Sequence, residues 1–130
     1  MHKPALAAGT LFAALAVVLG AFGAHALKAK LTPEMLAVFE TGVRYQFYHS
    51  FGLMITGICY GMSQFKNVKA ITALFISGIA LFSGSLYTIV FLSISGTSIG
   101  PAGILTPIGG LCFIIAWILL FLGLIKKGSS

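Results

Sequence analysis

Long stretches without a charged residue dominate the pattern along the chain. Residues 4–27 contain no Lys, Arg, Asp or Glu, and at about 1.5 Å per residue they are long enough to cross a hydrocarbon layer of roughly 30 Å. Residues 45–65 are also uncharged, as are residues 70–125, a run too long for one crossing. A Ser-, Gly- and Pro-rich break at 93–103 divides that run. The pattern therefore predicts four transmembrane helices, near residues 5–26, 43–65, 70–92 and 103–125.

The connection between the first two spans is the one strongly polar segment. Thr32, Pro33 and Glu34 have the order of a helix start, with an N-cap residue, a proline at the first helical position and an acid in the first turn. The following residues, EMLAVFETGV, mix apolar side chains with two carboxylates, which is typical of a helix lying at the membrane surface. We expect a short interfacial helix that ends where the chain turns inward near Gly42.

The first span also has features of a signal peptide. A short basic start at His2 and Lys3 precedes the apolar stretch, and Ala24-His25-Ala26 has the small-x-small form of a cleavage site. The apolar stretch is longer than the roughly 7–15 residues usual for such a peptide. We therefore interpret it as a retained transmembrane helix.

Composition places the chain among integral membrane proteins. Of its 130 residues, 58% are hydrophobic and 8% charged, against about a quarter charged in soluble domains. A chain of this size has no means of burying so much apolar surface on its own. We expect an all-α, four-helix transmembrane bundle formed by residues 1–130 as a single domain. Cys59 and Cys112 lie in apolar runs at different expected depths, so no disulfide is expected.

The distribution of cations predicts the orientation. The net charge is +6, but the cations stand at segment ends and form no run, which favours anionic lipid headgroups over nucleic acid as their partners. Four spans place both termini on one side of the membrane. The cations of that side are Lys3, Lys66, Lys69, Lys126 and Lys127, against Lys28, Lys30 and Arg44 on the other. The excess predicts that both termini are cytoplasmic and that the chain resides in the cell membrane.

Polar side chains of all four predicted spans fall at similar depth in the outer half of the bundle. His49, for example, lies six residues beyond Val43, roughly 9 Å into the outer leaflet. On the second helix Glu40 precedes Arg44 by four residues, which favours an ion pair. Gln46 falls roughly opposite Tyr48 and is left outside the group. The hypothetical binding cluster comprises His25, Glu40, Arg44, Tyr45, Tyr48, His49, Ser83, Ser85, Tyr87 and Thr106.

A simpler interpretation is that these polar side chains only lie at the lipid–water interface and form no binding site. Tyrosine belts and snorkelling arginines occur at any lipid interface, and the hydroxyls of Ser83, Ser85 and Thr106 are then expected to bond to their own helix backbones. We expect neither a metal site nor a catalytic set, because no acidic residue accompanies the histidines inside the membrane. Nothing in the sequence implies a cofactor.

Four sequence blocks resemble the signature blocks of the YgdD/YwdK-like family of small bacterial inner-membrane proteins, a domain of unknown function. The blocks are LGAFGAHALK from Leu19, FETGVRYQFYHS from Phe39, FSGSLY from Phe82 and TPIGGLCFIIAW from Thr106. The resemblance covers nearly the whole chain in order. It implies four transmembrane helices in the cell membrane, and it brings no activity, cofactor or catalytic residue with it. The blocks include every member of the hypothetical cluster.

The sequence supports two functional hypotheses. The leading one is a non-enzymatic membrane protein whose polar cluster organises helix packing or docks a lipid, a small solute or a partner subunit. The alternative is a small transporter or channel subunit that acts as an oligomer. The lack of polar residues in the inner half of the bundle is evidence against this alternative. An enzyme acting on lipid headgroups through His49 is a weaker third hypothesis, because it lacks a carboxylate at that depth.

Overall fold

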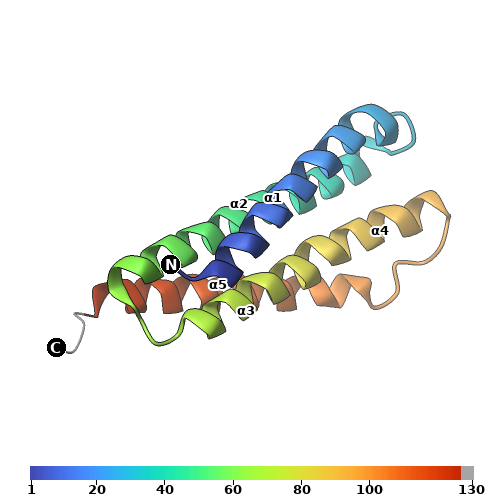
Figure 1. The fold of residues 1–130 in the computed structure, drawn as a ribbon. Coiled ribbons are helices and arrows are strands. Elements are labelled where there is room, and N and C mark those ends of the chain that lie inside the picture. Colours follow the sequence, from blue (N-terminus) through green and yellow to red (C-terminus); the bar gives the residue numbers. More distant parts are fainter. Residues whose placement is uncertain (127–130) are drawn as a thin grey trace.

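The computed structural model describes residues 1–126, which form helices and no strands. The elements are α1 (Lys3–Phe22), the π-helical turn η1 (Gly23–Leu27), α2 (Pro33–Ser63), α3 (Val68–Gly78), the π-helical turn η2 (Ile79–Ser83), α4 (Gly84–Ile94) and α5 (Ala102–Ile125). Because α1 runs directly into η1, and α3, η2 and α4 are continuous, the chain makes four helical rods. Figure 1 shows the rods side by side as two hairpins, α1 with α2 and α3–α4 with α5. The all-helical prediction is confirmed.

Three of the rods are long and apolar enough to cross a membrane by length and composition. They are Lys3–Leu27, Val68–Ile94 and Ala102–Ile125. The fourth rod, α2, has 31 residues and is the longest, but its polar residues keep it outside that set. Length and composition therefore identify three spans. They do not identify α2 as a fourth.

Helix α2 is continuous where a break was expected. Its start agrees with the sequence, since Thr32 is the N-cap and its hydroxyl accepts a hydrogen bond of 3.2 Å from the backbone N–H of Met35. The expected turn near Gly42, and with it the separate interfacial helix, is wrong. A glycine inside a helix costs only about 1 kcal/mol, and Gly42 is placed where a Cβ would lie 2.8 Å from the ring of Tyr87. Its lack of a side chain serves the contact between α2 and α4.

The first hairpin is held by close contacts at two glycines of its first rod and by a backbone hydrogen bond. A Cβ on Gly9 of α1 would lie 2.7 Å from the carbonyl oxygen of Ser50, and one on Gly23 would lie 2.5 Å from the ring of Phe39. At the other end the backbone N–H of His2 donates to the carbonyl of Gly57 over 3.1 Å. Helices α1 and α2 are therefore antiparallel neighbours from the first residues of α1 to its last turn.

The second hairpin is also packed through glycines. Gly109 of α5 lies against the backbone of Phe82 in η2, with no room for a Cβ, and the ring of Phe113 covers Gly78. The main apolar core extends from this contact toward the chain termini. Its buried members are Ala5, Leu53, Phe65, Val68, Ile71, Phe75, Ile79, Phe113, Ala116 and Leu120. Small residues thus fix the spacing of the rods, as is usual in lipid, where apolar side chains gain little by meeting one another.

Replacing Gly109 by alanine is expected to destabilise the bundle. The added methyl group overlaps the Phe82 backbone, which no rotamer change relieves, so the rods must separate at a cost of about 1–3 kcal/mol. Gly103→Ala is the matched control on the same helix, because, apart from its own helix backbone, no atom of residues 1–126 lies within 4 Å of its Cβ position. Thermal unfolding in detergent measures both variants, and equal melting temperatures for the two would contradict the assigned packing.

Candidate functional site

Gln46 joins three rods through one buried side chain. It is 3% exposed; its Nε2 donates to the carbonyl of Phe12 on α1 over 2.9 Å, and its Oε1 accepts from the hydroxyl of Tyr87 on α4 over 2.7 Å. In lipid there is no water to satisfy an amide, so a side chain of this kind is stable only with partners inside the bundle. These bonds make Gln46 the centre of a polar seam between the two hairpins.

Ser83 forms a second link across the same seam. Its hydroxyl, 1% exposed, donates to the carbonyl of Gly42 on α2 over 2.7 Å. The expectation that Ser83 bonds to its own helix is therefore wrong. Ser83 is the last residue of the π-helical turn η2, and π-helical turns often occur at functional sites. Tyr87 follows four residues later on the same face of the helix. Both side chains consequently reach α2.

Ser85 and Thr106 connect α4 to α5. Their hydroxyl oxygens lie 2.5 Å apart, and Ser85 Oγ also lies 2.8 Å from the carbonyl of Phe82. Since Ser85 has one hydroxyl proton, which it donates to that carbonyl, Thr106 must be the donor in the pair. Ser85 thus bonds both to its own helix, as expected, and to the neighbouring rod. With Gln46, Ser83 and Tyr87, the pair completes a polar seam that reaches all four rods.

His49 lies in an aromatic environment apart from this seam. Its Nδ1 is 2.6 Å from the carbonyl of Tyr45, and because a carbonyl only accepts, Nδ1 carries the proton. Its ring stacks on Phe113 with centroids 3.5 Å apart and planes at 6°, and Tyr45 stacks in turn on Phe82 with centroids 4.5 Å apart. His49 is 6% exposed. The arrangement is that of a packed core histidine that bonds its own backbone.

The remaining members of the hypothetical cluster lie on the surface. His25, Glu40, Arg44, Tyr45 and Tyr48 are all exposed. Within residues 1–126, Glu40 and Arg44 form no ion pair, which corrects that expectation. The ten residues therefore do not form one cluster. They separate into the buried seam, the aromatic contacts of His49, and an exposed row on α2, with His25 at the far end of α1.

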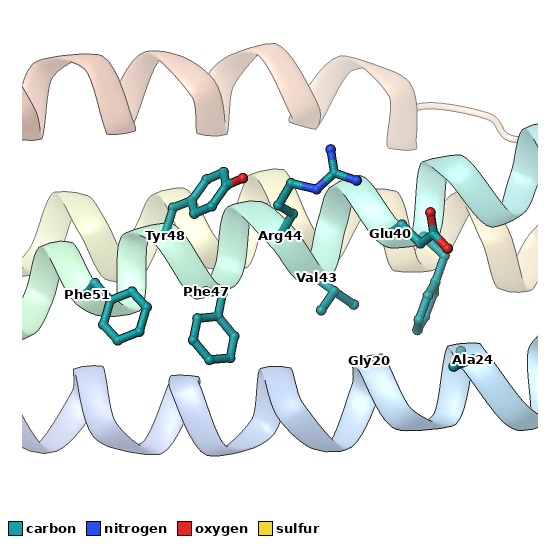
Figure 2. A pocket seen from close by; sticks show the side chains of 10 residues that line it. Gly20, Ala24, Glu40, Val43, Arg44, Phe47, Tyr48 and Phe51 are labelled. Atoms are coloured by element: carbon teal, nitrogen blue, oxygen red, sulfur yellow. The ribbon is translucent and has the colours of Figure 1, made fainter.

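A groove runs between α1 and the exposed row of α2. Its volume is about 420 Å³, within the range of roughly 300–1,000 Å³ common to small-molecule sites. Figure 2 shows Phe47 and Phe51 pointing toward α1, while Arg44 and Tyr48 point to the other side of α2. The small residues Gly20, Gly23 and Ala24 form the opposite wall. The groove is thus apolar along its floor and charged at one rim.

The charged rim lies at one end of the groove, next to the connection between α1 and α2. Glu40 and Arg44 occupy this end, whereas Phe47 and Phe51 lie farther along α2 toward the middle of the bundle. In the described chain, residues 1–126, no three His, Cys, Asp or Glu side chains are placed to hold a metal ion. The chemistry that the groove offers is recognition of a molecule with a charged head and an apolar body.

Gln46 is the residue that the sequence interpretation missed. We assigned the interior of α2 to the face of Arg44 and Tyr48, and Gln46 lies on the opposite face. A signal for the correct face was present, since Gly42, Gln46 and Ser50 recur at four-residue spacing. All three are buried. A stripe of small and amide side chains marks a helix contact in lipid better than tyrosines do, because tyrosine also favours the interface.

Comparison with known proteins finds close relatives without an assigned activity. The family described as protein of unknown function (DUF423) matches residues 19–110. The UPF0382 membrane protein SSP2132 of Staphylococcus saprophyticus is 43% identical over 118 residues, covering 91% of this chain and 93% of its own. The UPF0382 membrane protein YwdK of Bacillus subtilis is 40% identical over 121 residues, with coverage of 91% and 93%. No solved structure matches the chain.

Tyr87→Phe is expected to weaken the contact between the hairpins. The change removes the hydroxyl that Gln46 Oε1 accepts from, and interhelical hydrogen bonds of membrane proteins contribute about 0.6–1.7 kcal/mol. Tyr48→Phe is the matched control, because Tyr48 is 52% exposed and loses no bond to the bundle. Unfolding by a denaturing detergent measures the difference. If the two variants unfold at the same detergent concentration, the seam does not stabilise the contact between the hairpins.

Proposed function

This chain belongs to the DUF423 family of membrane proteins of unknown function, and we propose that it is a four-span, non-enzymatic protein that docks a membrane phospholipid. The lipid lies in the groove between α1 and α2, with its head at Glu40 and Arg44 and a tail along Phe47 and Phe51. The groove, apolar in its length and charged at one rim, is the observation that carries the proposal. The polar seam holds α2, the helix that forms one wall of the groove, in place.

The crossing of α2 is supported by its contacts with α1. These run from Gly57, beside His2, to Phe39, beside Gly23. A helix that lies antiparallel to a spanning helix over this length passes through the same thickness of membrane. Its residues 45–63 carry no charge and cover about 28 Å at 1.5 Å per residue, close to a hydrocarbon thickness of roughly 30 Å.

The orientation is inferred from the cations. With four crossings, the termini share a side with the α2–α3 connection, where Lys66 and Lys69 stand. Together with Lys3, Lys126 and Lys127 this side has the excess of positive charge that favours the cytoplasm. The groove rim then opens toward the outer leaflet of the cell membrane.

Lipid docking is favoured over transport by the distribution of polar groups. The interhelical hydrogen bonds of the seam stand in the half of the bundle near the α1–α2 connection. Toward the termini, the core is formed by apolar side chains such as Leu53, Ile71 and Leu120. The buried hydroxyls of Thr56 and Thr72 donate to their own helices. A solute path would need polar partners across both halves.

Filling the groove is expected to lower lipid retention strongly. Ala24 lines the groove and is exposed, so Ala24→Phe places a ring in the lipid's position without disturbing the core. Ala21→Phe is the matched control, since Ala21 is an exposed residue of the same rod outside the groove. Native mass spectrometry of the protein purified in mild detergent counts bound phospholipids.

We expect at least a roughly tenfold lower lipid occupancy for Ala24→Phe, equivalent to about 1.4 kcal/mol, and wild-type occupancy for Ala21→Phe. Equal occupancy in the two variants rules out the groove as the site. A wild-type protein that retains no phospholipid rules out the proposed function.

A further inference from the structure

We propose that the groove selects a phospholipid whose head carries both a phosphate and a primary ammonium group, as in phosphatidylethanolamine. This inference rests on the proposed function and adds the chemical class of the head. It is carried by two charges of opposite sign at the rim, Glu40 and Arg44, and by the order in which groups of different chemistry succeed one another along α2.

The two rim charges have no partner within the described residues. Glu40 and Arg44 stand one helical turn apart, at the spacing that suits an ion pair, yet no ion pair forms between them in residues 1–126. Figure 2 shows the guanidinium of Arg44 on the side of α2 away from α1, separate from the carboxylate of Glu40, and both residues are exposed. Both groups remain open to charges supplied by a ligand.

The order of groups along α2 is complementary to that of a phospholipid. Starting from the α1–α2 connection, the residues of α2 that line the groove include Glu40, Arg44, Tyr48 and Phe51. The polar ends of Arg44 and Tyr48 lie at the rim, on the side of α2 away from α1, and the ring of Phe51 points toward α1 (Figure 2). These four residues cover about 16 Å of helix at 1.5 Å per residue. A phospholipid standing in the membrane presents, from the surface inward, its ammonium, its phosphate, its ester groups and its tail. The order of residue types along this edge of the groove therefore matches the order of groups in the lipid.

Alternative heads satisfy this order less well. A glycerol head carries the phosphate but places no cation beside Glu40, one of only two acidic residues in the chain. A choline head carries a cation whose methyl groups offer no N–H to the carboxylate. Ethanolamine supplies three N–H donors, and hydrogen bonds between charged partners are about twice as strong as neutral ones. Arg44 suits the phosphate, which its planar fork can bind at two oxygens.

The test is a competition for the purified protein. Equal amounts of phosphatidylethanolamine, phosphatidylcholine and phosphatidylglycerol with identical acyl chains are offered in detergent, and native mass spectrometry measures which is retained. Because the rim is exposed and its charges are screened, we expect a preference for ethanolamine over choline of about fivefold. Glu40→Gln is expected to bring the ratio to about one while lipid is still bound, and Arg44→Gln lowers the retention of all three.

Glu34→Gln is the matched control, because it makes the same change at the other carboxylate of α2, which is exposed and outside the groove. It is expected to keep the wild-type ratio. Retention of the three lipids in equal amounts overturns the head selectivity and leaves lipid docking standing. A loss of preference in Glu34→Gln as large as in Glu40→Gln also overturns the selectivity. Retention of none, or a dimer that forms in place of lipid and is abolished by Ala24→Phe, overturns both proposals.

Discussion

Hydrogen-bonding groups inside a bilayer must find their partners within the protein, and this constraint determines how α2 is used. The helix carries an amide, a histidine and several hydroxyls in the stretch that crosses lipid in the proposed topology. Each of the buried ones is bonded: Gln46 to α1 and α4, and His49 and Ser50 to carbonyls one turn back. A helix with this content is stable in a membrane only between neighbours that supply those partners.

The two faces of α2 consequently have different tasks. The face of Gly42, Gln46 and Ser50 is buried, and its bonds hold the two hairpins together. The face of Glu40, Arg44 and Tyr48 is exposed and lies beside a groove, and its two charges form no ion pair with any residue of 1–126. The small residues Gly20, Gly23 and Ala24 form the other wall of this groove, along which we propose that an acyl chain lies. One helix therefore carries both the packing contacts and the site of the proposed recognition.

The sequence predicts where the helices of this fold lie in the chain better than it predicts which face of each helix points into the bundle. Apolar runs and the Thr32–Pro33 start indicate the helices, since each is a local property. Which face of α2 points inward is not a local property. Charged residues in a span usually face the interior, but Glu40 and Arg44 are exposed. The π-helical turns at Gly23–Leu27 and Ile79–Ser83 each insert a residue and rotate the next stretch of helix about its axis. The contact of Ser83 with Gly42 is therefore not predictable from ideal helical spacing.

The crossing of α2 is tested most directly by labelling its two ends in intact cells. Ala29 precedes the helix, Gln64 comes directly after it, and both are exposed. In a chain whose Cys59 and Cys112 are replaced by alanine, Ala29→Cys is expected to react with a membrane-impermeant maleimide added outside. Gln64→Cys is expected to react only after the membrane is permeabilised. Labelling of both cysteines from the same side would contradict the account.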